Sequence, residues 1–251
     1  MPEGDSLRQA ADRVRVLEGE VVRVEAPHPR AAALGIAPRL DGRRLERVEA
    51  VGKNLLLTFA GGLVLRSHLR MRGRWHVRRV GFPRSGTPWL VISGLEHEAI
   101  LWNGPVLELG RKAVDRLGPD IMAEPPQYDA IVTRLRVSDP GREIGDALLD
   151  QRLVAGIGNV WRAEALFEAG VSPWTRLGDL DDEALAGVVR AASEAMRGGR
   201  RERAVYRRGG RPCRRCGTPI SVRRQGETAR AVYWCARCQP VPRAGTAPSS
   251  A

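Results

Sequence analysis

The sequence predicts an α+β protein of several domains: a β-rich N-terminal domain with a flanking helix, a helical domain, and a small C-terminal module held by cysteines. Three observations lead to this prediction. Short β-rich runs separated by Gly, Pro or charged residues fill residues 20–109, helical periodicity follows from about Pro125, and all four cysteines lie between residues 213 and 238. The chain has 251 residues, 43% of them hydrophobic, which is enough for two cores and a third small module.

The chain begins MPEGD, and no signal-peptide pattern is present at this end. A small second residue allows removal of Met1, which would leave Pro2 as a secondary amine beside the carboxylate of Glu3. An α-amino group titrates near neutrality, so its neutral form can attack an electrophilic carbon. The alternative is that these residues only precede a helix. That helix is predicted over 5–18, capped by Asp5 or Ser6, with an apolar stripe at Leu7, Ala10, Ala11, Val14 and Leu17.

Eight β-rich runs follow, and their turn signals predict a sandwich or a barrel beside the first helix. The runs are EVVRVEA, LERVEAV, NLLLTF, GLVLRSH, RWHVRRV, WLVISG, EAILW and VLEL. Helices are then predicted over 127–137, 143–151, 159–170 and 180–199. The glycines of RLVAGIG precede the helix predicted to start at Asn159. The N-terminus of a helix can bind phosphate. The alternative is a pair of helices that only pack against each other, which would show the same pattern. Residues 197–212 form a basic linker, and the tail 241–251 is expected to be disordered.

The cysteines are spaced C-x2-C, an 18-residue gap, and C-x2-C, at Cys213, Cys216, Cys235 and Cys238. This spacing is typical of a zinc ribbon. The alternative is two disulfides, but nothing in the sequence suggests secretion, and disulfides are rare in the cytosol. Four thiolates would complete a tetrahedral site, so one structural Zn²⁺ is predicted, which would fold a segment too short to build its own core.

The net charge of +12 favours a polyanionic partner, most simply nucleic acid. A general bias toward arginine is the competing explanation, because only Lys53 and Lys112 among 41 basic residues are lysines. The same bias makes each lysine informative, since the pKa of lysine can be moved by burial whereas arginine stays protonated. No apolar run approaches the length of a membrane span.

Six motifs in order resemble the formamidopyrimidine-DNA glycosylase / endonuclease VIII family, closest to its endonuclease VIII branch. They are MPEGD at residue 1, GK at 52–53, SHLRM at 67–71, RLGPD at 116–120, LLDQRLVAGIGNV at 148–160, and CRRCGTPI…ARAVYWCARC at 213–238. The resemblance implies a catalytic β-sandwich over 1–122, a helix–two-turn–helix DNA-binding domain over 123–205 and a zinc ribbon over 206–240. The tail 241–251 lies outside these domains.

The resemblance also implies catalytic roles. Pro2 is the nucleophile that attacks the sugar C1′ and forms an iminium ion, and Glu3 moves protons at the sugar. Lys53 is a second acid or holds the phosphate of the lesion; the alternative for it is a solvated turn residue. Arg230 matches the arginine of the ribbon hairpin that grips phosphate and assists the last elimination.

Further residues match positions that contact DNA. Asn159 matches the asparagine that binds DNA phosphate, and Arg116 is another candidate for a DNA contact. Arg70, Met71 and Arg72 are candidates for filling the space left when the damaged base is flipped out of the duplex. Glutamine, leucine and tyrosine are typical there in endonuclease VIII, so this departure leaves opposite-base preference and lesion range open. Met71 as a plain core residue is the alternative.

The implied activity is that of a bifunctional DNA glycosylase/AP lyase acting mainly on oxidised pyrimidines. Two alternatives are an enzyme of the same fold for oxidised purines and a zinc-ribbon DNA-binding protein without catalysis. The expected partner is double-stranded DNA with damaged bases or abasic sites. We expect a monomer in the bacterial cytoplasm, associated with the nucleoid and not with a membrane.

Overall fold

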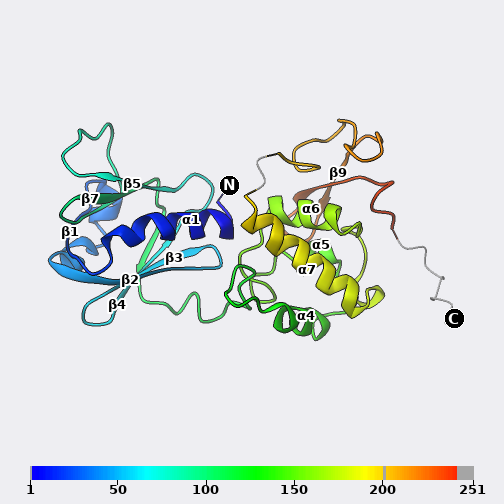
Figure 1. Ribbon diagram of the computed structural model, residues 1–251, viewed down its shortest axis with the longest axis horizontal. Coiled ribbons are helices and arrows are strands. Elements are labelled where there is room, and N and C mark those ends of the chain that lie inside the picture. Colours follow the sequence, from blue (N-terminus) through cyan, green and yellow to red (C-terminus); the bar gives the residue numbers. More distant parts are fainter. Residues whose placement is uncertain (1, 200–201, 242–251) are drawn as a thin grey trace. The chain divides into compact units, whose positions relative to one another are not determined.

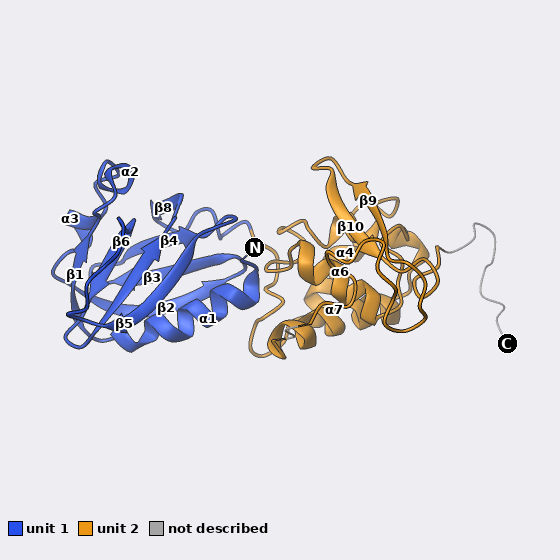
Figure 2. Ribbon diagram, turned by 90° about the horizontal axis from the view of Figure 1, so that it is seen from above, with its two compact units in different colours: residues 1–116 blue, residues 117–251 orange. Residues whose placement is uncertain are grey.

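The computed structural model describes residues 2–199 and 202–241, and the chain divides into two compact units between Arg116 and Leu117 (Figure 2). Most of the predicted tail 241–251 lies outside the described residues. Among the described residues, no helix is long and apolar enough to cross a membrane.

Unit 1 begins with helix α1 (Gly4–Val14), which a 3-10 turn extends over Arg15–Leu17 (Figure 1). The predicted apolar stripe from Leu7 to Leu17 is buried. The predicted cap was wrong, because Glu3 occupies the N-cap position and its carbonyl accepts hydrogen bonds from the backbone N–H groups of Ser6 and Leu7. Asp5 lies instead in the first turn, where a negative charge is favourable near the positive end of the helix dipole.

Every β-rich run predicted from the sequence contains a strand. The strands are β1 (Val21–Glu25), β2 (Arg43–Val51), β3 (Asn54–Phe59), β4 (Leu63–His68), β5 (Arg74–Arg79), β6 (Leu90–Ser93), β7 (His97–Trp102) and β8 (Val106–Leu109). They pair antiparallel in the order β5-β7-β6-β1-β2-β3-β4-β8. β1 pairs with β2 through its first residues and with β6 through its last three, so it joins two four-stranded layers. Of the two predicted alternatives, a sandwich and a barrel, the structure is the sandwich.

The core of unit 1 takes side chains from α1 and from both layers of strands, including Leu57 of β3 and Ile92 of β6. Two short helices that the sequence did not predict, α2 (Pro29–Ala32) and α3 (Ala37–Leu40), lie between β1 and β2. Each has proline in its first turn, where the missing N–H costs no hydrogen bond.

Unit 2 contains helices α4 (Tyr128–Arg136), α5 (Ile144–Ala147), α6 (Asn159–Glu168) and α7 (Asp182–Arg197), and a 3-10 turn over Leu177–Asp179. The helix predicted over 143–151 is shorter than expected and ends at Ala147. The carboxylate of Asp150 accepts the backbone N–H of Arg152, and the amide of Gln151 bonds Gly156 N and Ile157 O. These side chains fix a loop where the periodicity alone predicted more helix.

A hairpin of β9 (Ser221–Gln225) and β10 (Arg230–Trp234) packs against α6. A small separate core lies between them and includes Phe167 of α6 and Val205 of the preceding linker. The buried carboxylate of Glu164 accepts the backbone N–H groups of residues 204, 205 and 206. Apolar packing therefore holds the hairpin against α6, and hydrogen bonds hold the linker that precedes it.

Candidate active site and nucleic-acid interface

The N-terminal group consists of Pro2 and Glu3 at the start of α1. Pro2 is half-buried, and Glu3 is 1% exposed at the N-cap. Once Met1 is removed, the nitrogen of Pro2 becomes a secondary amine adjacent in the chain to this buried carboxylate. The pair can therefore supply a nucleophile and a proton-transfer group at one position.

Lys53 occupies the two-residue turn between β2 and β3, where Val51 pairs with Asn54. The turn bends sharply because Gly52 adopts a φ of 58°. The next strand brings His68 opposite Asn54. Burial lowers the pKa of His68 to about 4, and the positive charges of Arg70, Arg66 and Lys53 act in the same direction. His68 is therefore neutral at physiological pH and lies within the electrostatic reach of Lys53.

The loop after β4 carries the three residues predicted to fill the space of a flipped base. His68 Nδ1 accepts the backbone N–H of Arg70 at 3.0 Å, and Arg70 has a left-handed φ of 50°. Met71 is 63% exposed, so the alternative that it is a core residue is wrong. Arg70, Met71 and Arg72 line a cavity of about 310 Å³ together with Trp89, Asn103 and Pro105.

Asn103 was not predicted from the sequence, although the N-G-P turn at 103–105 is a local signal. It also has a φ of 50°, and it lies in the connection between β7 and β8. Asparagine tolerates this conformation better than most residues, so Asn103 forms a tight turn at the edge of the cavity.

In unit 2, Asn159 is the first residue of α6 and is largely buried. Its Nδ2 donates to the carbonyl of Ala231 on β10 at 3.0 Å, and its Oδ1 accepts a hydrogen bond from Arg162. Arg162 is fully buried and also donates to Ala231 O at 3.1 Å and to Gly145 O at 3.1 Å. The structure therefore brings Asn159 next to the strand that begins with Arg230.

Arg162 was missed by the sequence analysis. The feature of the sequence that could have revealed it is an arginine three residues after Asn159, in a helix whose other side chains are mostly apolar. The guanidinium of Arg162 also donates to Gln225 Oε1 at 3.3 Å, and Gln225 Nε2 donates to Glu143 Oε2 at 2.8 Å. These bonds connect α6, the residue before α5, and the β9–β10 hairpin.

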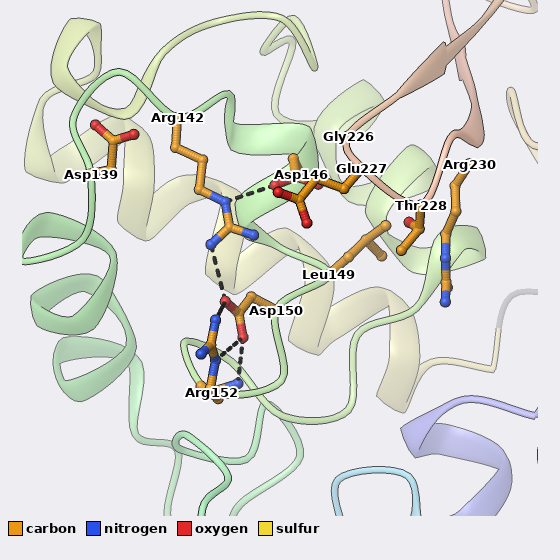
Figure 3. Close-up of a pocket in the computed structure, with 10 residues that line it drawn as sticks. All are labelled: Asp139, Arg142, Asp146, Leu149, Asp150, Arg152, Gly226, Glu227, Thr228 and Arg230. Atoms are coloured by element: carbon orange, nitrogen blue, oxygen red, sulfur yellow. Dashed lines mark hydrogen bonds and ion pairs between the residues drawn. The ribbon is translucent and has the colours of Figure 1, made fainter.

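Arg230 is exposed, pairs with Gln225 across the hairpin, and lines a cavity of about 550 Å³ (Figure 3). Arg142 bonds Asp146 at 2.7 Å and Asp150 at 3.0 Å on the opposite side of this cavity, and Arg152 bonds Asp150 at 2.8 Å. Hydrogen bonds from the Arg152 side chain hold the pKa of Asp150 well below its usual range, because they outweigh its partial burial. Arg116 is an exposed residue at the end of unit 1.

The four cysteines are free thiols whose sulfur atoms all lie within 4.8 Å of one another. The Sγ atoms of Cys213 and Cys238 are 3.9 Å apart, and those of Cys216 and Cys235 are 3.4 Å apart. Convergence of four sulfurs on one point, rather than two separate pairs, is what a metal ion requires. The cluster can hold a metal ion.

The chain thus combines a β-sandwich, a helical domain and a four-cysteine hairpin with a net charge of +12. Comparison with known proteins identifies the family. The model of the formamidopyrimidine-DNA glycosylase N-terminal domain matches residues 1–152, and that of the H2TH domain of the same enzyme matches residues 117–205. The chain belongs to the formamidopyrimidine-DNA glycosylase family, on its endonuclease VIII side.

Individual relatives agree with this assignment. A probable endonuclease 8 of Streptomyces coelicolor is 38% identical and is covered to 97%, with 98% of this chain aligned. A DNA-(apurinic or apyrimidinic site) lyase of Mycolicibacterium smegmatis is 34% identical over 95% of this chain and 99% of its own length. A Lactococcus lactis formamidopyrimidine-DNA glycosylase bound to DNA with an abasic site shares the fold, with a TM-score of 0.78, 24% identity and coverage of 96% and 99%.

Proposed function

We propose that this protein is a bifunctional DNA glycosylase/AP lyase that removes oxidised pyrimidines from duplex DNA and then cuts the strand. The observation that carries the proposal is the juxtaposition of Pro2 with the buried carboxylate of Glu3 at the start of α1. The names of the relatives support it, since they are an endonuclease 8 and an abasic-site lyase. A DNA-binding module without catalysis has no use for such a pair.

In the proposed reaction, the amine of Pro2 forms a bond to the sugar C1′ while the bond from C1′ to the base breaks. The base leaves with a proton, the sugar ring opens, and a cationic iminium remains on Pro2. The iminium acidifies the adjacent sugar proton, so its removal expels the 3′ phosphate, and hydrolysis then frees the amine. Glu3 transfers protons at the sugar, and Lys53 serves as a second acid or holds the phosphate of the lesion.

The proposed DNA contacts involve both units. Asn159 and Arg230 grip phosphate near the lesion, and Arg116 is a further contact. The short path from Asn159 through Ala231 to Arg230 supports this, because the hydrogen bond from Asn159 to the Ala231 carbonyl holds the start of α6 beside the strand that begins with Arg230. The exposed loop of Arg70, Met71 and Arg72 enters the duplex after the damaged base is flipped out.

The cysteine cluster fits one Zn²⁺. Tetrahedral bonds of about 2.3 Å place sulfurs about 3.8 Å apart, close to the 3.4 and 3.9 Å observed. Four thiolates fill the coordination sphere, so the ion would supply folding energy to the hairpin and no catalysis. Cys213, Cys216, Cys235 and Cys238 would therefore act at a distance, by holding the strand of Arg230.

The test is borohydride trapping with protein whose loss of Met1 has been verified by mass spectrometry. Duplexes carry dihydrouracil, 5-hydroxyuracil, 8-oxoguanine or an abasic site, and borohydride reduces any iminium to a stable adduct. We expect adducts on the pyrimidine lesions and a much lower yield with Pro2→Gly, whose affinity for the duplex serves as the control.

Other outcomes would change the proposal. Trapping on 8-oxoguanine in place of the pyrimidines would indicate an oxidised-purine enzyme, and absence of any adduct would refute the catalytic proposal. All the curated relatives named above are bacterial, which supports placing the enzyme in the cytoplasm, at the nucleoid. We expect it to act as a monomer, which light scattering of the protein with and without a duplex would check.

A further inference from the structure

The two faces of the β2-β3-β4-β8 layer differ in chemistry. Leu55, Leu57 and Leu65 point into the core of unit 1. The register places Asn54 opposite His68, Leu56 opposite Arg66, and Arg66 opposite Glu108. Because side chains alternate along a strand, these residues share the other face. A polar row therefore crosses three strands and reaches the residue directly after Lys53.

Asn54 closes the turn that carries Lys53. It is 5% exposed, and its Nδ2 donates to the carbonyl of Val51 at 3.1 Å, which adds a side-chain bond across the turn. Its Oδ1 accepts from Arg66 Nη1 at 2.7 Å. The orientation of this amide is unambiguous, because a guanidinium can only donate and a carbonyl can only accept. Both ends of the Asn54 amide are thus held.

Arg66 is itself held in place. It is 9% exposed, and its Nε and Nη2 donate to the same oxygen of Glu108 at 3.2 and 2.8 Å. Glu108 is exposed, so it neutralises the buried guanidinium from the solvent side. A buried charge with a fixed partner on each side has little freedom to move. The hydrogen-bonded series Glu108–Arg66–Asn54 therefore restrains the turn that carries Lys53.

We propose that Asn54 and Arg66 are positioning residues for Lys53, which set the direction in which its ammonium group points. For its catalytic consequence this inference rests on the proposed function of Lys53. Lysine has a long, flexible side chain, and an error of about 1 Å in placing a catalytic group can cost about a hundredfold in rate. A turn of two residues would not fix the lysine backbone as firmly without the bond from Asn54 to Val51.

The first test uses the two lysines of this chain, Lys53 and Lys112. Protein labelled with ¹³C at lysine Cε gives two signals, and Lys112 is exposed in another segment, so it serves as an internal control. We expect Asn54→Ala and Arg66→Met to shift or broaden the Lys53 signal and to leave the Lys112 signal in place. Arg66→Lys keeps a cationic donor and adds a third lysine signal, and in this variant the Lys53 signal should return part of the way to its wild-type position.

Arg47→Ala is the matched control, because Arg47 lies on the same face of β2, is exposed and pairs with Glu49. It should leave both signals unchanged. An unchanged Lys53 signal in Asn54→Ala and Arg66→Met would overturn the inference. Equal movement of the Lys112 signal would also overturn it, because the variants would then act by general loss of structure.

The second test measures base excision in a single turnover. Asn54→Ala should lower the rate roughly ten- to a hundredfold, with a Kd for the lesion duplex within about twofold of wild type. In a Lys53→Ala background the same substitution should cause no further loss, since it acts through that lysine. Independent, additive losses contradict the inference. If wild type excises no base while the Lys53 signal still responds, the proposed function fails and the positioning role stands.

Discussion

Replacing His68 with glutamine removes a titrating group and supplies a side-chain oxygen that can accept the backbone N–H of Arg70 in place of Nδ1. In the folded protein the pKa of His68 is lowered from 6.5 to about 4, first by burial and then by the charges of Arg70, Arg66 and Lys53. The unfolded chain therefore binds a proton at this residue before the folded protein does. The stability that neutral His68 contributes is present above about pH 6.5 and declines as the pH falls toward 4.

The size of the effect follows from the shift. A change from 6.5 to about 4 corresponds to at most about 3 kcal/mol. His68 is only partly buried, so solvent screening reduces this, and we expect about 1 to 2 kcal/mol. Between pH 7 and 4 the wild type should lose this much more stability than His68→Gln. All other titrating groups are shared by the two proteins and cancel in the comparison.

NMR of the four histidine Cε1 groups measures the cause directly. One signal of wild type should titrate near pH 4, and the same signal should be missing in His68→Gln. Urea unfolding of both proteins at pH 7, 5.5 and 4 then gives the difference in free energy. If the signal assigned to His68 titrates above pH 6, or the two proteins lose stability in parallel, the account of this site is wrong.

Three further predictions concern unit 2. Gly226→Ala should lower the melting temperature more than Gly210→Ala. Both glycines have positive φ, but an added Cβ at 226 would lie 2.1 Å from Asp146 Oδ1, whereas an added Cβ at 210 would have no atom within 4 Å. Asp181→Ala should cost about 1 kcal/mol in thermal denaturation, because the side chain accepts the backbone N–H of Ala184 at the start of α7. A strong chelator should loosen the β9–β10 hairpin, which should weaken binding of the lesion duplex and change the fluorescence of the protein's tyrosines. Adding Zn²⁺ should reverse both effects. Binding that survives complete metal removal would contradict the structural role of the cluster.

Most strands could be predicted because their signal is local. NLLLTF is a run of β-forming residues between turn residues, and it is β3 (Asn54–Phe59). One error arose where side chains competed with the helical pattern. The carboxylate of Asp150 and the amide of Gln151 bind the loop backbone, which ends α5 early.

The site was less predictable than the fold. Motif positions predicted Lys53 and Asn159. The residue that contacts Asn159, and the residue that holds Asn54 beside Lys53, come from other parts of the chain. Asn159 contacts the carbonyl of Ala231, and Asn54 contacts Arg66 only because of the register of β3 and β4. Register depends on the assembled sheet, so no local pattern could predict these contacts.

The cavity beside Arg230 is lined by three arginines and four acidic residues, and by no lysine. An abasic sugar exists partly as an open-chain aldehyde, with which an unprotonated amine condenses. Guanidinium groups stay protonated at any physiological pH, so an arginine does not compete with an amine for this aldehyde. With only two lysines in the chain, a surface built from arginine confines adduct formation to very few nitrogen atoms. A strongly cationic protein can in this way hold a reactive carbonyl without being cross-linked to it at random.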